Sequence, residues 1–305
     1  MRTAFVETLV EMAGKDDRIF LLTGDLGWSV LEPFSGKYPD RFVNVGVAEA
    51  DMTGIATGLA LAGYVPFTYS IATFASMRPY EQIRNGPIQH RLPVRVIGTG
   101  GGFAYGHAGV SHFALEDLAI MRCQPGMTVI APADPAQTRA ALHAIRDLAG
   151  PVYMRVGKGG NPAVPELEGR FAFGRPEMVR EGTALLYLCT GGTVPDALEA
   201  SRLLEGKGIR AAVAVLAHLG FTGSPELADL LGRFPAVITV EEGYVTGGLG
   251  SLVAETMASR RLSCRLAVKG VERSPGGRSG GPEFMRAGAG LDSASLAAAA
   301  SALLD

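Results

Sequence analysis

Short apolar runs alternate with helix-length segments along the first half of the chain. The runs that predict β-strands are "RIFLLT", "RFVNV", "YVPFTY", "PVRVIG", "MTVIAP" and "PVYMRV". Strands that alternate with helices are typical of a parallel sheet covered by helices on both faces. The segment "ADPAQTRAALHAI" agrees with this pattern, because Asp134 is suited to cap a helix that begins at Pro135. We therefore expect a doubly wound α/β domain over residues 1–160.

A change of pattern follows this region. The stretch "GKGGNPAVPELEGRFAFGRPEMVREG" is rich in Gly, Pro and charged residues and has no apolar period, which predicts a linker over residues 161–180. Beyond it, "TALLYLCT", "IRAAVAVL", "PAVITVEE" and "CRLAVKGV" again alternate with helical segments. A second, smaller α/β domain is expected over residues 181–305.

Composition narrows the possible partners. The 28 basic and 30 acidic residues give a formal charge of −2, and they are scattered without a run of Lys or Arg. A chain of this kind lacks the basic patch that nucleic acids require, so we expect no nucleic-acid partner. The segment "MRTAFVETLVEMAGKDD" carries Glu7 and Glu11 where a signal peptide needs an apolar region, and no run of apolar residues is long enough to span a bilayer. No membrane association is expected.

The cysteines bear on the compartment and on metal binding. Cys123, Cys189 and Cys264 are odd in number and far apart, which fits neither a disulfide framework nor a CxxC zinc site. A reducing, cytoplasmic location is therefore expected, and no metal site is expected within this chain.

One glycine-rich stretch can be compared with two common phosphate-binding motifs. In "GTGGGFAYG", Phe103 stands where the dinucleotide-binding fingerprint requires its third glycine, and no GxxxxGK[ST] motif occurs anywhere. Both the Rossmann and the P-loop interpretations fail. The same stretch leads on to His107 and His112, and it follows a predicted strand, where ligands commonly bind. It is either a ligand-binding loop or a flexible connection.

Glu49 is the most conspicuous carboxylate of the first half. It stands in "FVNVGVAEADMTGIATGLALAG", between a strand-like run and a helix rich in Gly and Ala. A glutamate in the first turn of a helix gains about 0.3–1 kcal/mol from the helix dipole, so a purely structural role is possible. A broad apolar stripe and the small residues Gly54 and Gly58 would also let another helix pack closely here. Glu49 would then lie near an interface and could share a proton with a ligand.

Five stretches of the sequence together resemble one family. They are "NVGVAEADMTGIATGLALAGYVPF", "TGDLGWS", "ATFASMRPYEQIRN", "GHAGVSHFALEDLAIMRCQPGMTVIAPAD" and "TVEEGYVTGGLGSLVAE". In this order, over nearly the whole chain, they resemble the carboxyl-terminal half of transketolase and, more distantly, 1-deoxyxylulose-5-phosphate synthase and the pyruvate dehydrogenase beta subunit. The resemblance implies a pyrimidine-binding domain, followed by the smaller, mixed-sheet C-terminal domain of a thiamine-diphosphate enzyme.

The other half of the family fold is missing from this sequence. Its diphosphate-binding domain carries a GDG motif, and the nearest approach here is "TGDLG". The chain thus resembles one subunit of a split transketolase, a transferase that moves a two-carbon ketol unit from a ketose to an aldehyde. The resemblance implies a heterotetramer with a diphosphate-binding partner subunit, without which the chain is inactive and which supplies the ligands of Mg²⁺.

The resemblance assigns several residues to the cofactor. Glu49 matches the catalytic glutamate that hydrogen-bonds the aminopyrimidine ring of thiamine diphosphate and so promotes proton transfer. Phe74 matches an aromatic residue that stacks on this ring, and Tyr69 lies just upstream. Asp25 matches a position near the thiazolium. Plain core packing would also explain the two aromatic residues, and a local turn would explain Asp25.

Further matches concern the substrate. His112 matches a catalytic histidine that acts on the carbonyl oxygen of the donor, and His107 lies in the same loop. Ser29 matches a position in the substrate channel. Arg155 matches an arginine that binds the sugar phosphate, although a surface arginine is the plain alternative.

Two departures from the family affect the expected substrate. Gly100 and Gly101 replace a basic residue, and Ala108 replaces an aspartate four residues before His112. A less phosphorylated or unusual sugar in a specialised pathway is therefore expected. Two alternatives stay open, namely a subunit of a pyruvate-decarboxylating synthase or dehydrogenase, and a catalytically silent subunit that stabilises its partner.

Overall fold

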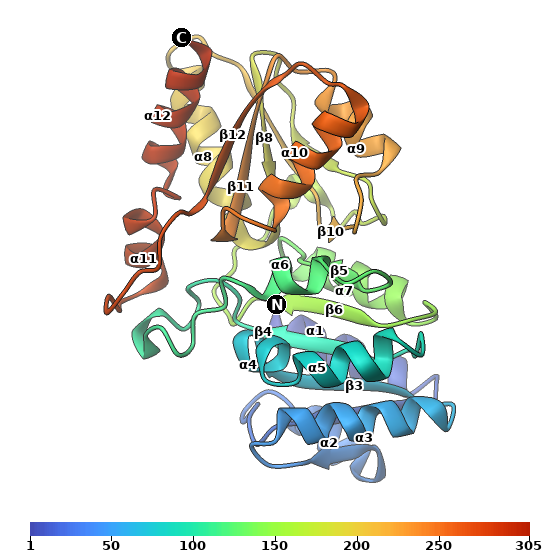
Figure 1. Cartoon of the computed structure of the whole chain (residues 1–305). Helices are drawn as coiled ribbons and strands as arrows, with labels where there is room; N and C mark the ends of the chain where they lie inside the picture. Colours follow the sequence, from blue (N-terminus) through green and yellow to red (C-terminus); the bar gives the residue numbers. More distant parts are fainter.

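Two β-sheets, stacked end to end in Figure 1, organise the chain, and the computed structural model describes all residues from Met1 to Asp305. The first sheet has seven strands in the order β10-β5-β6-β4-β3-β1-β2, and all neighbours are parallel except β10 and β5. Its strands are β1 (Ile19–Thr23), β2 (Phe42–Asn44), β3 (Val65–Ile71), β4 (Arg95–Thr99), β5 (Thr128–Ile130), β6 (Val152–Val156) and β10 (His218–Leu219).

Helices cover both faces of this sheet, because alternate strand residues point to opposite sides. Tyr153 of β6 belongs to one buried cluster, and its neighbours Val152 and Met154 belong to another. The first cluster lies under α3 (Glu49–Leu61), α4 (Ala72–Met77), α5 (Tyr80–Ile83) and α6 (Asp117–Arg122). The second lies under α1 (Arg2–Ala13), α2 (Glu32–Lys37) and α7 (Pro135–Ile145). The predicted doubly wound architecture is confirmed, and the Asp134 carboxylate caps α7 by accepting from the Gln137 N–H at 2.8 Å.

The second sheet has five strands in the order β12-β11-β8-β9-β7, and its edge strand β7 is antiparallel to β9. The predicted mixed sheet is therefore confirmed. Its strands are β7 (Glu177–Arg180), β8 (Leu185–Cys189), β9 (Ala211–Val215), β11 (Ala236–Tyr244) and β12 (Arg265–Val271). One face is covered by α8 (Val194–Glu205) and α12 (Ser293–Leu304), and the other by α9 (Pro225–Leu231) and α10 (Leu249–Arg260).

The two halves are joined by more than the connecting chain. Strand β7 lies within the segment 161–180, and β10 leaves the second half to pair with β5 of the first sheet. A buried cluster crosses the same boundary, where Val129 and Ala131 of the first half pack with Leu216 and Leu219 of the second. The sequence did not predict β7 or β10, because the strands are too short to show an apolar period.

The C-terminal segment Pro282–Leu304 is long and apolar enough, with a mean hydropathy of 1.3, to cross a membrane by composition alone. In the structure it is broken into α11 (Pro282–Gly288) and α12, and Asp292 caps α12 by accepting from the Ser295 N–H at 3.0 Å. Leu296 and Ala300 of α12 are fully buried against the second sheet. The apolar face of α12 is thus used within this chain.

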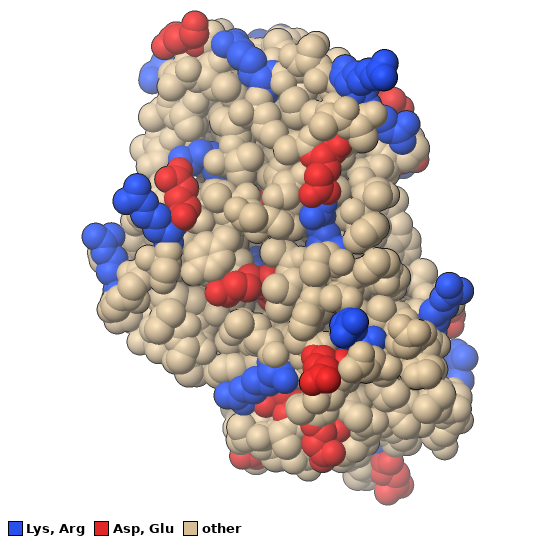
Figure 2. Space-filling model, in the orientation of Figure 1, with Lys and Arg blue, Asp and Glu red and all other residues tan.

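Short turns of 3₁₀ and π helix complete the fold, at Pro39–Arg41, Arg84–Ile88, Gly106–Ala108, Pro165–Leu167 and Gly191–Thr193. Charged side chains lie singly or in small groups of both signs over the face seen in Figure 2. This face carries no continuous basic stripe of the kind that binds a phosphate backbone.

Candidate active site at the carboxyl edge of the first sheet

Four connections meet at one edge of the first sheet, because they follow the carboxyl ends of neighbouring parallel strands. Residues 24–29 follow β1, residues 45–49 follow β2, residues 72–78 follow β3, and residues 100–112 follow β4. In open α/β sheets this edge is where ligands bind. The predicted site residues lie on these connections, except Tyr69 and Arg155, which lie within β3 and β6.

Glu49 is the first residue of α3, and only 2% of it is exposed. Its Oε1 accepts a hydrogen bond from the Ser70 hydroxyl at 2.9 Å, and its Oε2 accepts one from Arg78 Nη1 at 2.8 Å. No backbone N–H of α3 donates to this carboxylate, and the helix has no side-chain cap. The contacts of Glu49 therefore point toward the sheet edge, and helix capping does not explain them.

Phe74 and His112 lie next to this carboxylate. The Arg78 guanidinium stands 3.8 Å from the centre of the Phe74 ring, a cation–π contact, and it joins that ring to Glu49. Phe74 in turn contacts His112 edge to face, with ring centres 5.1 Å apart. The Ser111 hydroxyl lies 2.9 Å from His112 Nδ1. Of the predicted residues, Glu49, Phe74 and His112 thus form one contiguous cluster, joined through Arg78.

Ser70 and Arg78 are members of this cluster that sequence reasoning missed. Arg78 directly follows α4 and stands one helical turn after Phe74. A cation four residues after an aromatic residue on a helix is a recognisable signal for such a contact. Ser70 gave no signal, because its register on β3 relative to Glu49 follows only from the pairing of the strands.

Tyr69 occupies the other face of the sheet. It is fully buried, and its ring stacks on Phe5 of α1 with centres 5.5 Å apart. Its hydroxyl has no hydrogen-bond partner, and burial raises the pKa of this phenol. Tyr69 therefore packs in the core beneath α1 and does not join the Glu49 cluster.

Asp25 and Ser29 belong to the turn after β1. Both have left-handed backbone conformations, with φ of 58° and 63°, which are uncommon for residues other than glycine. The Asp25 N–H donates to Asn44 Oδ1 at 3.0 Å, and the Asn44 amide donates back to the Asp25 carboxylate at 3.1 Å. The Ser29 N–H donates to Glu32 Oε1 at 2.7 Å. Backbone strain of this kind persists where neighbouring contacts hold it, and it is concentrated at functional sites.

Arg155 is buried in an ion pair with Asp117, and its Nε donates to Asp117 Oδ2 at 2.9 Å. The same guanidinium donates to the carbonyl oxygens of Ala114 at 3.1 Å and Glu242 at 2.9 Å. These bonds fasten the end of the glycine-rich loop to β11. The Arg155 guanidinium is directed to these partners, and such contacts favour a structural tie over the predicted binding of a sugar phosphate.

Lys158, three residues further on, is a partly exposed cation that follows β6 at this edge. Its Nζ lies 4.1 Å from the centre of the Tyr105 ring, and no carboxylate pairs with it. Sequence reasoning missed Lys158 because "GKGG" has the composition of a linker. The signal was its position directly after a strand that neighbours β4 in the sheet.

The glycines that replace the family's basic residue have a steric explanation. A side chain at Gly100 would collide with the Tyr105 ring, and a side chain at Gly101 would collide with Arg155. Gly100 also has φ of +74°, which disfavours any larger residue. Tyr105 and Arg155 occupy this space, and a basic residue does not fit at either position.

His107 lies on an exposed 3₁₀ turn, Gly106–Ala108, that borders the second domain. The Gly280 N–H donates to the Gly106 carbonyl at 3.1 Å, which ties this turn to the segment before α11. His107 lies beside Gly281 of the same segment. Its imidazole is therefore at the domain boundary, outside the Glu49 cluster.

Two further carboxylates, Glu241 and Glu242, bind backbone N–H groups at and near the second domain. Glu241 caps α10, because its oxygens accept from the N–H groups of Leu249 at 3.0 Å and Gly250 at 2.8 Å. Glu242 accepts from the Phe103 N–H at 2.7 Å and so joins β11 to the glycine-rich loop. Burial raises the pKa of both groups. Their contacts are with backbone amides, which indicates a structural role.

The donor set fits one end of thiamine diphosphate. A buried carboxylate beside a half-buried aromatic ring can bind a protonatable, planar heterocycle such as the aminopyrimidine. No group of three or more His, Cys, Asp or Glu side chains is arranged to hold a metal ion. The residues present thus fit the pyrimidine ring.

Comparisons with known proteins identify the family of this chain. Residues 1–162 match the model of the transketolase pyrimidine-binding domain, and residues 174–296 match that of the transketolase C-terminal domain. The chain belongs to the transketolase family, and it holds these two domains of it.

Several relatives are named as subunits of transketolases. A 6-deoxy-6-sulfo-D-fructose transketolase subunit of Clostridium sp. is 38% identical over 258 residues, which are 84% of this chain and 80% of that protein. An apulose-4-phosphate transketolase subunit of Phocaeicola vulgatus is 35% identical over 267 residues, with coverage of 87% and 86%. A split-gene transketolase solved as an inactive β4 tetramer superimposes with a TM-score of 0.85 at 35% identity, over 99% of this chain and 97% of that chain.

Proposed function

We propose that this chain is the pyrimidine-binding and C-terminal subunit of a split, thiamine-diphosphate-dependent transketolase. It would transfer a two-carbon ketol unit from a ketose donor to an aldehyde acceptor. The observation that carries the proposal is the buried Glu49 carboxylate at the carboxyl edge of the first sheet, bound by Ser70 and Arg78 and by no backbone N–H of its own helix. The names of the relatives as transketolase subunits support the same reaction class.

The residues of this chain have distinct tasks in the proposed site. When bound, thiamine diphosphate supplies the carbanion chemistry that cleaves and forms the carbon–carbon bond. Glu49 would hold a proton at the pyrimidine ring, and Phe74 would contact the face of that ring. His112, next to Phe74, would donate to the carbonyl oxygen of the substrate. Arg78 must share Glu49 with the pyrimidine or release it, because both bind the same carboxylate.

The substrate is proposed to be an unusual sugar. The family's basic residue has no room at Gly100 or Gly101, and Ala108 replaces its aspartate, so one anion contact and one hydroxyl contact are absent. Lys158 supplies one cation to the entrance. Relatives named for a sulfonated and for a phosphorylated sugar are consistent with a terminal anion on the substrate, bound here by Lys158.

A partner subunit is proposed to bring the diphosphate-binding domain and the Mg²⁺ ligands, in a heterotetramer of two copies of each chain. The exposed face of α3 supports this proposal. Beyond Gly54 and Gly58 a Cβ would meet open space, and Val47 and Leu61 expose 71% and 67% of their surface beside them. An apolar surface of small residues at the edge of a site suits close packing of another chain.

The test is reconstitution of this chain with a diphosphate-binding transketolase subunit. Ketol transfer from a ketose to an aldehyde, dependent on thiamine diphosphate and Mg²⁺, is the expected result. Release of labelled carbon dioxide from pyruvate would instead identify the decarboxylating alternative. Activity that survives replacement of both Glu49 and His112 would identify a silent, stabilising subunit.

Two further measurements follow from the same proposal. By calorimetry the chain alone should bind thiamine diphosphate weakly or not at all, so that micromolar binding would contradict the need for a partner. The reconstituted complex should turn over xylulose 5-phosphate poorly, and Ala108→Asp should improve the use of donors that carry the matching hydroxyl. An unmodified complex that reaches an ordinary rate of about 10 per second on this substrate would show that the loop does not limit it.

A further inference from the structure

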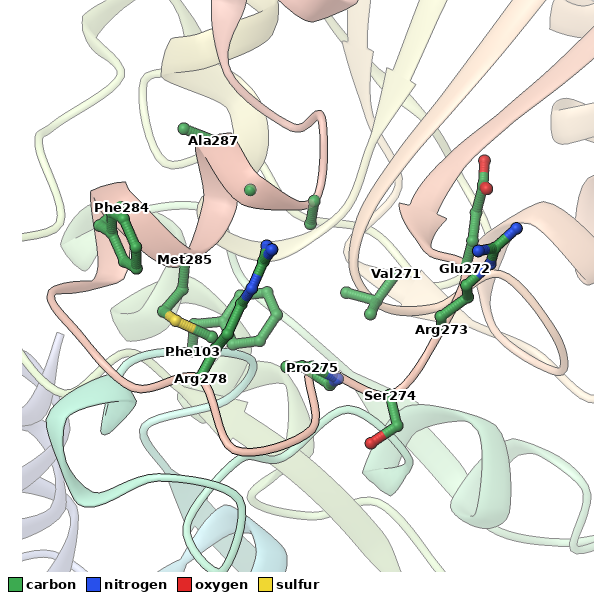
Figure 3. Close-up of a pocket in the computed structure, with 12 residues that line it drawn as sticks. Phe103, Val271, Glu272, Arg273, Ser274, Pro275, Arg278, Phe284, Met285 and Ala287 are labelled. Carbon is green, nitrogen blue, oxygen red and sulfur yellow. The ribbon is translucent and has the colours of Figure 1, made fainter.

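A second cavity lies away from the Glu49 cluster, between the end of β12 and α11. Its volume is about 690 Å³, within the range of about 300–1,000 Å³ typical of small-molecule sites. The loop of residues 272–281, "ERSPGGRSGG", forms one wall, and α11 forms the other (Figure 3). The lining of this cavity includes none of the predicted site residues.

The floor of this cavity is apolar and rigidly packed. Phe103, Val271 and Met285 are each less than 5% exposed, and they belong to one buried cluster together with Phe113 and Leu115. Phe103 and Phe113 pack edge to face with ring centres 5.2 Å apart. Because the side chains of the floor already fill a cluster, the cavity is a preformed surface that can receive an apolar group.

The walls carry two guanidinium groups, Arg273 and Arg278, and one carboxylate, Glu272, which lies next to Arg273 at the end away from Arg278. Arg278 extends from the loop toward α11, past Phe103 and Met285, in Figure 3. Its Nη1 would lie 3.9 Å from a Cβ at Gly288, so the guanidinium reaches the inner side of α11. Arg273 stands at the other end of the same loop. Neither guanidinium forms an ion pair, whereas Arg286 of α11, outside the cavity, pairs with Asp196 at 3.8 Å.

We propose that this cavity binds a small organic anion with an apolar body. The apolar part would lie on Phe103, Val271 and Met285, and its carboxylate, sulfonate or phosphate group would be bound by Arg278, with Arg273 nearby. A planar guanidinium matches the geometry of these anions and forms strong charge-assisted hydrogen bonds with them. The proposal is independent of the function proposed above, because it involves other residues.

An occupant would also act on the glycine-rich loop. Phe103 of the cavity floor belongs to that loop, and Phe113 follows His112 directly. The Gly280 N–H binds the Gly106 carbonyl at 3.1 Å, so the cavity wall and the loop share a backbone hydrogen bond. A ligand packed on Phe103 should therefore reduce the local opening of residues 100–114.

The experiment is calorimetric titration of the full chain with naphthalene-1-sulfonate, which has an apolar body and one anionic group. We expect saturable binding at one site. Arg278→Gln should weaken it roughly tenfold to hundredfold, because it removes a charge-assisted hydrogen bond. Arg260→Gln is the matched control, since it removes the same charge from the last turn of α10, which does not line the cavity. The uncharged naphthalene-1-sulfonamide should bind more weakly than the sulfonate.

Ala287→Trp provides a second variant at an exposed position of the wall, where a large ring would fill the cavity. It should abolish binding of the probe while the unfolding transition stays in place. Hydrogen exchange should show slower exchange of residues 100–114 with the probe present, in the unmodified chain and not in Ala287→Trp.

Equal affinity of the unmodified chain and Arg278→Gln would overturn the proposal, as would equal losses in Arg278→Gln and Arg260→Gln. Unchanged probe binding in Ala287→Trp, together with a changed oligomeric state, would show that the face is an interface between chains.

Discussion

Two buried glutamates stand beside the first turns of helices, one in each domain, and they are bound in opposite ways. Glu241 accepts from two backbone N–H groups at the start of α10, so it satisfies donors that the helix leaves free. Glu49 accepts from two side chains, Ser70 and Arg78, and from no N–H of α3. The difference teaches that sequence position alone does not define a cap. Glu241 satisfies donors of the helix that it caps, whereas Glu49 is bound by side chains from outside its helix.

The surroundings of the two glutamates also differ, because Glu241 is enclosed and Glu49 lies near exposed residues. Glu241 is enclosed by β11, β12 and α10, and a side chain at Gly248 would collide with its carboxylate. Glu49 borders a strained turn at Asp25 and the exposed side chain of Val47. The Glu241 carboxylate is thus enclosed within the second domain. The Glu49 carboxylate lies at an edge of the first sheet where a ligand or a second chain has room to bind.

Replacing Glu49 should have the largest effect of the changes considered, and the effect should be on turnover. In the assembled complex Glu49→Ala should lower turnover by roughly 10²–10⁴, because it removes a general acid–base group. If Glu49 only stabilised its helix, the cost would be at most about 1 kcal/mol of stability, and turnover would be kept.

Deuterium exchange at the reactive carbon of bound thiamine diphosphate is the decisive measurement for this variant. Asp51→Ala is the matched control, since Asp51 is an exposed carboxylate in the first turn of the same helix. Equal exchange rates in Glu49→Ala and the unmodified complex would return Glu49 to a structural role.

Arg155 and Lys158 offer a similar comparison between a buried, paired cation and an unpaired one. Arg155→Ala should destabilise the chain by about 3–5 kcal/mol, because Asp117 would be left buried without its partner. Lys158→Ala should change stability by no more than about 0.5 kcal/mol. It should instead raise KM for an anionic sugar in the complex. Urea unfolding and steady-state kinetics measure the two effects, and a stable Arg155→Ala variant with a raised KM would reverse the assignment.

Glu241→Ala should reduce the free energy of unfolding by about 1–3 kcal/mol, since two buried N–H groups lose their acceptor. Its effect on turnover per folded complex should be small. Glu226→Ala, which removes an exposed acidic residue from the first turn of α9, serves as the control in chemical denaturation. A loss of turnover without a loss of stability would show that the two glutamates are not so different.

The effect of His218 is confined to acid pH, and it should be absent near pH 7. Burial lowers the pKa of His218 to about 4, from an ordinary value of 6.5. Between these values the unfolded chain binds the proton and the folded chain does not, so His218 destabilises the fold progressively as pH falls from 6.5 toward 4. His218→Gln should flatten this decline relative to the exposed control His90→Gln in unfolding experiments at several pH values. Identical pH profiles would show that β10 opens before His218 titrates.

Much of the fold could be predicted from the sequence, because long apolar runs and a capped helix such as the one after Asp134 carry their signal locally. Strands β7 and β10 could not, since each depends on a partner far along the chain. In the candidate site the sequence pointed to Glu49, Phe74 and His112. It did not distinguish Arg155 from Lys158, because only tertiary packing decides which cation meets Asp117.

The two-residue strand β10 has a consequence for dividing the protein. It shields the outer edge of the first sheet by pairing with β5, although its residues come from the second domain. An unshielded edge strand is a template for another chain, so residues 1–162 produced alone would expose β5 and self-associate. The junction between the family domains is therefore a boundary in the sequence, and separating the folded molecule there would expose the edge of the first sheet.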